Sequence, residues 1–183
     1  MFYAIFGYNR CYKIIGFKWG RVESGCELMM YDEKRTGGAG MVEKEEFYLN
    51  STNGVNKLHV ISWHPLDEIR AIVQISHGMC EYVDRYDRLA TFLAQHGIMV
   101  IGNDHLGHGE TARDEDELGY FPGVNGSETV VDDLYKVTTS IRAQYPRLPY
   151  FLLGHSMGSF VVRNVLTKYG TDYAGTVIMG TSG

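Results

Sequence analysis

The segment FLLGHSMGSF, residues 151–160, joins the pattern of a buried strand to a G-x-S-x-G motif. Ser156 lies between Gly154 and Gly158, at the point where the apolar run gives way to a helical pattern. A strand that turns this sharply into a helix leaves room only for glycine two positions before and after the serine. The free N–H groups of the helix start can stabilise negative charge beside the hydroxyl. The motif therefore predicts that Ser156 is a nucleophile, and an ordinary helix cap is the alternative.

Strands and helices alternate on both sides of this segment. Apolar or alternating runs predict strands at 45–50, 55–63, 70–76, 98–103, 150–154 and 175–180. Helical spacing predicts helices at 84–96, 127–145 and 157–170. The first is expected to be capped by Asp84 and to carry Leu89, Phe92, Leu93 and His96 on one face. This alternation indicates an α/β protein with a mostly parallel sheet and flanking helices.

Composition and charge exclude several classes of protein. The 183 residues suffice for one domain, and a hydrophobic content of 44% with 21% charged residues is ordinary for a globular protein. The net charge of −5 argues against nucleic acid as a partner. No apolar run approaches the length of a transmembrane segment. Three scattered cysteines favour a reducing compartment, so we expect a cytoplasmic protein.

Residues 1–40 differ from the remainder of the chain. They are aromatic and basic at the start, glycine-rich at the end, and keep no sustained strand or helix period. We expect 1–40 to be an N-terminal extension outside the fold, disordered or not native, with Met41 as the true start. The domain is then expected to comprise residues 41–183.

A second motif follows the predicted strand at 70–76. The sequence HGMCE places Gly78 and Met79 at the carboxyl end of that strand, where α/β sheets build their sites. The loop after such a strand supplies the second donor of an oxyanion hole. We therefore expect the backbone N–H groups of Met79 and Met157 to form the oxyanion hole, with Gly78 allowing close approach. An ordinary glycine turn is the alternative.

These motifs carry a resemblance to a known family. Residues 76–111, SHGMCEYVDRYDRLATFLAQHGIMVIGNDHLGHGET, and then 132–160, DDLYKVTTSIRAQYPRLPYFLLGHSMGSF, resemble the monoacylglycerol lipase and lysophospholipase group of α/β-hydrolases. That group is often classed with the serine aminopeptidases. The resemblance runs from about residue 43 to residue 183. It implies an α/β-hydrolase fold, Ser156 as nucleophile, Met79 and Met157 at the oxyanion hole, a lipid ester as substrate and no cofactor. Cys80 departs from the small residue that the group usually has at this position.

Other polar residues have plainer interpretations. In DHLGHG, His105 and His108 are three residues apart, but the glycine between them indicates a loop and no third ligand has suitable spacing. We expect no metal, and the resemblance implies that this loop shapes the wall of the site. His155 is expected to point away from Ser156 and to pack against its neighbours.

A serine nucleophile needs a base and an acid that orients the base. In α/β-hydrolases both follow the serine in the chain, yet none of the seven histidines lies after Ser156. The sequence therefore predicts the N-terminal part of an α/β-hydrolase, truncated after the strand at 175–180 and inactive alone. The apolar edge at 176–179 would favour self-association. The alternatives are a peptidase or other ester hydrolase on the same fold, and a non-catalytic fragment or pseudoenzyme that acts by binding.

Overall fold

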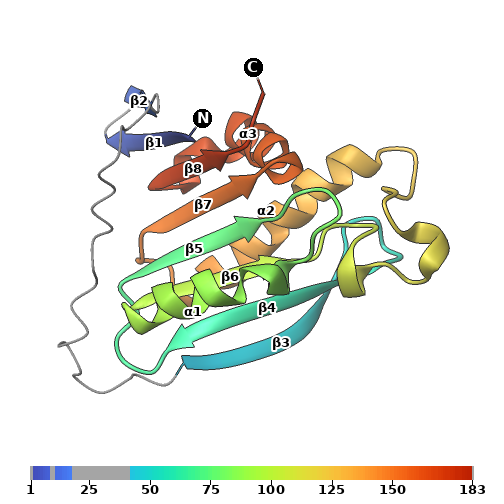
Figure 1. Ribbon diagram of the computed structural model, residues 1–183, viewed down its shortest axis with the longest axis horizontal. Coiled ribbons are helices and arrows are strands. Elements are labelled where there is room, and N and C mark those ends of the chain that lie inside the picture. The colour runs from blue at the N-terminus through green and yellow to red at the C-terminus, as the bar shows by residue number, and fades with distance from the viewer. Residues whose placement is uncertain (1, 9–10, 18–41, 183) are drawn as a thin grey trace, which may run out of the picture.

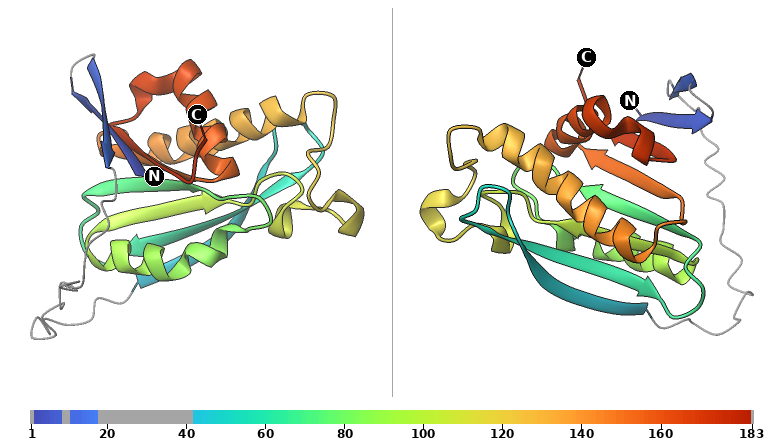
Figure 2. Two further views of the ribbon diagram at one scale, coloured as in Figure 1. Left: turned by 45° about the horizontal axis from the view of Figure 1, so that its top comes forward. Right: turned by 180° about the vertical axis from the view of Figure 1, so that it is seen from behind.

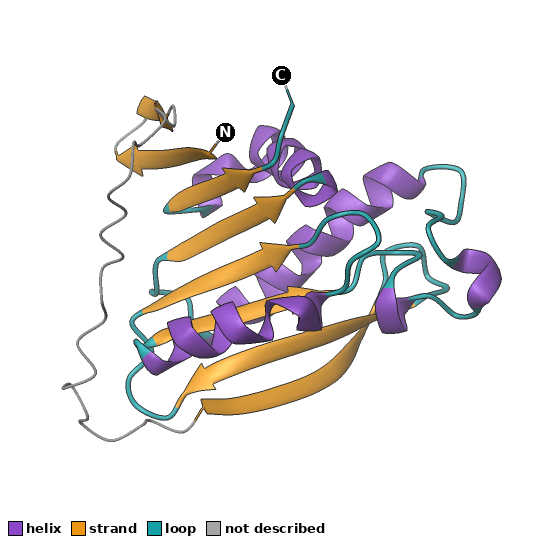
Figure 3. Cartoon of the chain, in the orientation of Figure 1, coloured by secondary structure: helices purple, strands orange, loops and turns teal. Residues whose placement is uncertain are grey.

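The computed structural model describes residues 2–8, 11–17 and 42–182. Eight strands form one sheet in the order β2-β1-β8-β7-β5-β6-β4-β3 (Figures 1 and 3). The strands are β1 (Phe2–Tyr8), β2 (Cys11–Phe17), β3 (Val42–Asn50), β4 (Lys57–Pro65), β5 (Ala71–Ser76), β6 (Ile98–Asn103), β7 (Tyr150–His155) and β8 (Gly175–Met179). The helices are α1 (Asp87–Gln95), α2 (Gly126–Gln144) and α3 (Met157–Tyr169), with short 3₁₀ turns at Val83–Tyr86, Gly109–Thr111, Glu115–Glu117 and Gly170–Asp172.

The central strands are parallel, and this arrangement confirms the predicted α/β fold. β5 pairs in parallel with both β6 and β7, and β7 pairs in parallel with β8. β4 runs antiparallel to β6 and to β3. Helix α1 covers one face of the sheet, whereas α2 and α3 cover the other (Figures 1 and 2). The carboxyl ends of β5 and β7 therefore meet at one edge, and β7 leads directly into α3.

The structure differs from expectation at the start of the chain. Strand β1 pairs antiparallel with β8, from Phe2 opposite Met179 to Phe6 opposite Gly175, and β2 pairs with β1. Two segments of 1–40 thus extend the sheet, and β1 occupies the side of β8 that was expected to be an open edge. The remaining residues of this stretch, 1, 9–10 and 18–40, lie outside the described ones. The start at Met41 and the self-association stay predictions.

Each face of the sheet has its own hydrophobic core, because side chains alternate between the two faces of a strand. Ile72 of β5 belongs to the core under α2 and α3, whereas Ile75 belongs to the core under α1. The first core buries apolar residues of both α2 and α3, including Val130, Leu134, Val137, Ile141, Val161, Val162 and Val165. The second is smaller and includes Ile61, Trp63, Val83, Ala90, Ala94 and Val100.

Helix α1 begins later and faces differently from the prediction. Asp84 lies in the preceding 3₁₀ turn and accepts a hydrogen bond from Lys44 Nζ at 2.5 Å, so the expected cap is wrong. The buried residues of α1 are Ala90 and Ala94. Of the predicted face, Leu89 and Phe92 are exposed, whereas Leu93 is half-buried against the second core. Residues 83–86 form a 3₁₀ turn, which has fewer residues per turn than an α-helix. Treating 84–96 as one continuous α-helix therefore assigns the wrong residues to the buried face.

A buried polar network joins β5 to helix α2, to β7 and to Tyr173 before β8. Gln74 Oε1 accepts hydrogen bonds from Thr138 Oγ1 at 2.7 Å and from Tyr150 Oη at 2.8 Å, and Gln74 Nε2 donates to Leu134 O at 2.8 Å. Thr138 also bonds the hydroxyl of Tyr173 at 2.9 Å. Satisfied networks of this kind specify one packing arrangement, because an unpaired buried polar group is costly.

Replacing Gln74 with leucine is expected to lower the free energy of unfolding by about 2 kcal/mol, because the buried Tyr150 hydroxyl loses its acceptor. Adding Tyr150→Phe removes that orphaned group. The double variant should therefore lose about 1 kcal/mol less free energy of unfolding than the two single variants lose together. Urea unfolding of all four proteins measures this coupling, and strictly additive losses would contradict it.

Within the described ranges, no helix combines the length and the apolar character needed to cross a membrane.

Candidate functional site

The turn at Ser156 has the geometry of a strained strand-to-helix elbow. Ser156 has φ 49° and ψ −118°, one of two positive φ values among the described non-glycine residues. Its N–H donates to Met179 O of β8 at 2.9 Å, and its carbonyl accepts from Ser159 N at 2.9 Å and Ser159 Oγ at 2.6 Å. Such strain persists only where the surroundings enforce it, and is common at functional sites. The bonds to β8 and α3 supply that enforcement.

Glycine is required on both sides of the elbow because backbone packs against it. A Cβ on Gly158 would lie 2.0 Å from Ser76 O and 2.5 Å from His77 O. A Cβ on Gly154 would lie 2.7 Å from the carbonyl oxygen of Gly158. The neighbouring atoms are main-chain atoms that cannot rotate away. Both positions therefore have room for a hydrogen only, and this close packing brings β5, β7 and α3 together at Ser156.

The loop after β5 lies beside the nucleophile. A Cβ on Gly78 would lie 3.2 Å from Ser156 Cβ, so the two turns are in contact. Met79 follows with 65% of its surface exposed, and Met157 is the first residue of α3. Within the described residues, the Met79 N–H makes none of the backbone hydrogen bonds outside helices and strands, and Met157, as the first residue of α3, has no preceding helical turn to donate to. Both donors are thus available beside Ser156, and their role at an oxyanion hole stays a proposal.

All seven histidines are described, and none bonds to the Ser156 hydroxyl within the described ranges. Three of them, His77, His105 and His108, are buried under the site. His155 does not merely pack, since its Nδ1 lies 3.3 Å from the carboxylate of Glu81. The other three bond elsewhere: His59 to Asp104, His64 to Ser62 and His96 to Phe92.

The DHLGHG loop is held by its own aspartate. Asp104 accepts hydrogen bonds from His59 Nδ1 at 2.9 Å, from Val83 N at 2.7 Å and from Glu110 N at 2.9 Å. A Cβ on Gly109 would lie 2.1 Å from Asp104 Oδ2, so the chain wraps tightly around this carboxylate. Among the described residues, no group of three His, Cys, Asp or Glu could hold a metal ion.

Burial favours the neutral form of His77 and of His105. It lowers the pKa of His77 to about 4, against smaller opposing effects from the bond to Gly78 and the charge of Asp104. Burial also lowers the pKa of His105 well below its ordinary value, reinforced by the neighbouring His77 and His108. The rings of His77 and His105 are 4.4 Å apart between centroids. Two imidazolium rings this close would repel each other, so the contact adds to the effect of burial.

Sequence reasoning missed Glu81. Its Oε2 accepts from Gly78 N at 2.8 Å and from Tyr86 Oη at 2.9 Å. Burial raises the pKa of Glu81, but the hydrogen bonds from Gly78, Tyr86 and His155 outweigh this and hold it below its ordinary value. The available signal was an acidic residue three positions after Gly78, where a side chain can reach back to the loop N–H.

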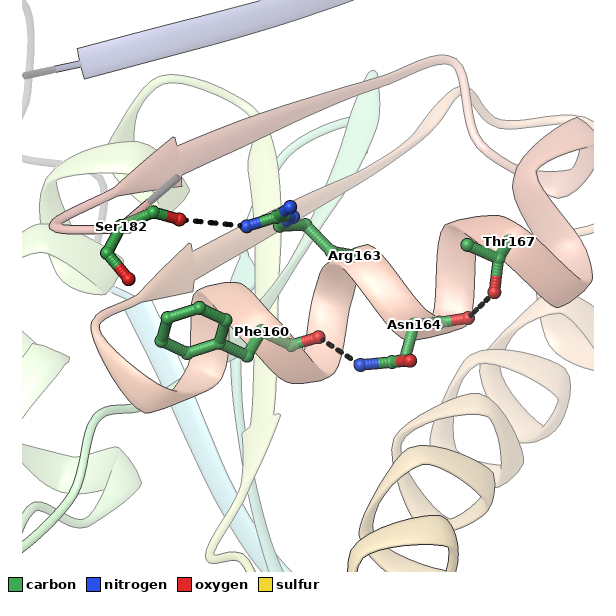
Figure 4. Close-up of a pocket in the computed structure, with 5 residues that line it drawn as sticks. All are labelled: Phe160, Arg163, Asn164, Thr167 and Ser182. Atoms are coloured by element: carbon green, nitrogen blue, oxygen red, sulfur yellow. Dashed lines mark hydrogen bonds between the residues drawn. The ribbon is translucent and has the colours of Figure 1, made fainter.

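A surface pocket along α3 is separate from these groups. It is lined by Phe160, Arg163, Asn164, Thr167 and Ser182. Figure 4 shows Arg163 reaching across to Ser182, whose carbonyl accepts from Nη1 at 3.0 Å. The lining holds neither a carboxylate nor a histidine, so this pocket has no general base.

Known proteins are similar to this chain in sequence and in fold. The family model described as serine aminopeptidase, S33, matches residues 67–182. A monoglyceride lipase homolog from Monkeypox virus is 37% identical over an alignment of 106 residues that covers 54% of this chain and 34% of the relative. A monoacylglycerol lipase from Mycolicibacterium smegmatis is 31% identical over 133 residues, 72% of this chain and 45% of the relative.

The fold comparison agrees. The crystal structure of a thermostable carboxyl esterase from Bacillus coagulans matches with a TM-score of 0.71 at 35% identity, covering 76% of this chain and 45% of the esterase. The chain thus spans less than half the length of each of these three proteins. With more than half of its residues matched by the family model, the chain belongs to the serine aminopeptidase S33 family of α/β-hydrolases.

Proposed function

We propose that this chain carries the nucleophile and oxyanion hole of a serine hydrolase that cleaves lipid carboxylic esters. The observation that carries the proposal is the positive φ of Ser156, 49°, at the junction of β7 and α3. A serine is held in this strained region only by the packing of Gly158 against β5 and the bond of Ser156 N–H to Met179 O. An ordinary helix cap requires no such strain, and Ser156 makes no side-chain cap bond.

The proposed reaction proceeds through an acyl-serine. Ser156 Oγ attacks the carbonyl carbon while a base removes its proton, and the oxyanion is stabilised by the N–H groups of Met79 and Met157. The carbon–oxygen bond to the leaving alcohol then breaks as the base returns the proton to that alcohol. Water, activated by the same base, hydrolyses the acyl-serine and releases the fatty acid.

The base is proposed to come from sequence outside residues 1–183. Within the described residues no hydrogen bond joins any of the seven histidines to the Ser156 hydroxyl, and His77, His105 and His108 are buried in other contacts. A nucleophile without its base retains little activity. The chain alone is therefore proposed to bind substrate without efficient turnover, in a cytoplasmic protein whose substrate is a monoacylglycerol or a lysophospholipid. The names of the relatives favour the monoacylglycerol.

A substrate panel on a form extended beyond Gly183 tests this proposal. We expect fatty acid release from a monoacylglycerol or a lysophospholipid, and none of the amine release from an aminoacyl nitroanilide that a peptidase would give. Cleavage of the anilide in place of both esters would assign a peptidase, the activity after which the family is named. A folded protein that binds lipid esters but cleaves nothing would support the non-catalytic alternative.

A further inference from the structure

Both backbone polar groups of Gly78 are bound by side chains. Glu81 Oε2 accepts the Gly78 N–H at 2.8 Å, and His77 Nδ1 lies 2.8 Å from the Gly78 carbonyl oxygen. The two groups belong to different peptide units. The Gly78 N–H is part of the His77–Gly78 peptide, and the Gly78 carbonyl is part of the Gly78–Met79 peptide. The two side chains therefore fix the rotation of both peptides that flank this glycine. Glycine has no Cβ to restrict those rotations itself.

The hydrogen bonds determine the tautomer of His77. The backbone N–H of His105 donates to His77 Nε2 at 3.0 Å, so Nε2 carries no proton. A carbonyl oxygen can only accept, and Nδ1 must therefore be the protonated nitrogen that donates to Gly78 O. The ring is fully buried, where the neutral form is favoured. His77 is thus a fixed donor aimed at the Gly78–Met79 peptide.

This donor decides the direction of the Met79 N–H. In a trans peptide the carbonyl and the N–H point to opposite sides of the bond that joins them. Anchoring the Gly78 carbonyl on His77 turns the Met79 N–H away from the buried histidines. Ser156 Cβ would be only 3.2 Å from a Cβ on Gly78, so the loop has the nucleophile as its neighbour.

Glu81 connects the same loop to the elbow. Besides the Gly78 N–H, its carboxylate accepts from Tyr86 Oη at 2.9 Å and from His155 Nδ1 at 3.3 Å. His155 directly precedes the nucleophile, and the Glu81 side chain is only 16% exposed. One carboxylate therefore joins the Met79 loop, the 3₁₀ turn before α1 and the end of β7.

We propose that His77 and Glu81 are positioning residues that orient the Gly78–Met79 peptide so that the Met79 N–H serves as an oxyanion donor. This role rests on the proposed function of Ser156 as the nucleophile. Neither side chain touches the reacting atoms. Misorienting one oxyanion donor should cost about 10² in kcat, with KM changing less than about threefold.

Matched variants separate positioning from simple stability. His77→Asn keeps a donor at the place of Nδ1 and loses the acceptor for His105 N–H, whereas His77→Gln keeps the acceptor and loses the donor to Gly78 O. Both leave space in the same buried site. Glu81→Gln keeps an acceptor for the Gly78 N–H, and Glu81→Leu removes it.

Nitrogen-15 NMR of the 183-residue chain reads the arrangement without any catalysis. We expect the His77 ring to be protonated at Nδ1. The chemical shift of the Met79 amide should change in His77→Gln and remain the same in His77→Asn. The Gly78 N–H should exchange about tenfold faster in Glu81→Leu than in Glu81→Gln, as for the loss of one hydrogen bond. The signals of β4, β5 and β6 verify the fold of each variant.

Protonation of His77 at Nε2, or equal Gly78 exchange in the two Glu81 variants, would overturn the inference. Equal Met79 shifts in the two His77 variants would do the same. These outcomes are independent of whether Ser156 is the nucleophile, because no ester is present. If ester hydrolysis fails to depend on Ser156 while the NMR results hold, the proposed function is wrong and the loop geometry stands.

Discussion

The 183-residue chain is expected to hydrolyse short-chain nitrophenyl esters at no more than a trace rate. A form extended beyond Gly183 that supplies the base should be faster by on the order of 10⁶ in kcat, the usual cost of losing the histidine of a serine hydrolase. The physical reason is that a serine hydroxyl is a weak nucleophile until its proton is removed. The seven histidines of this chain are bound elsewhere, with His77 and His105 fully within the protein.

Ester hydrolysis by both forms is compared with that of their Ser156→Ala variants. Rapid turnover by the 183-residue chain that disappears in Ser156→Ala would place the base within residues 1–183. His105 and His108 would then be the first residues to examine, and the buried arrangement described above would have to open. Slow turnover that persists in Ser156→Ala is background hydrolysis and agrees with the expected trace rate. Rapid turnover that persists in Ser156→Ala would contradict Ser156 as the nucleophile.

Replacing Gly158 with alanine is expected to destabilise the protein by about 3 kcal/mol, because the added methyl group overlaps backbone. Alanine normally favours a helix over glycine by about 1 kcal/mol, so intrinsic propensity predicts the opposite sign. The new Cβ would lie 2.0 Å from Ser76 O and 2.5 Å from His77 O. Only a separation of α3 from β5 can relieve that overlap, and it would also displace Ser156 from the oxyanion loop.

The control for this substitution is Gly54→Ala. Gly54 has φ +71°, and a methyl group added there would meet no atom within 4 Å, so the substitution incurs conformational strain without a clash. Its cost should be about 1–2 kcal/mol. Thermal and urea unfolding compare the two variants. A Gly158→Ala protein as stable as Gly54→Ala would show that the elbow is packed less tightly than described.

Much of the fold was predictable because local patterns and tertiary structure agree. The strand at 70–76 is observed as Ala71–Ser76, and the helix predicted at 127–145 as Gly126–Gln144. The first is a continuous apolar run, as expected for a central strand buried on both faces, and the second keeps a helical apolar spacing that packs against one face of the sheet. The N-terminal strands were not predictable in the same way, since Phe2–Tyr8 lacks strand alternation and its partner β8 is far away in sequence.

The site was predictable only where a backbone requirement leaves a mark on the sequence. The elbow demands glycine at 154 and 158, so Ser156 stands out. Glu81 and the tautomer of His77 leave no such mark, because they depend on contacts between β5, β7 and the loop after β6. The rotation of α1 was mispredicted for a related reason, since a 3₁₀ turn at Val83–Tyr86 shifts the helix start.

The central claim, that Ser156 is the nucleophile, is tested most directly by covalent labelling. A fluorophosphonate phosphonylates an active serine, as an oxygen–phosphorus bond forms, fluoride leaves and the base takes the hydroxyl proton. Mass spectrometry of the extended form after labelling should find one adduct, on the peptide containing Ser156, and none in Ser156→Ala. An adduct on another residue, the exposed Cys80 included, together with an unmodified Ser156 in an enzyme inactivated by the reagent, would contradict the account.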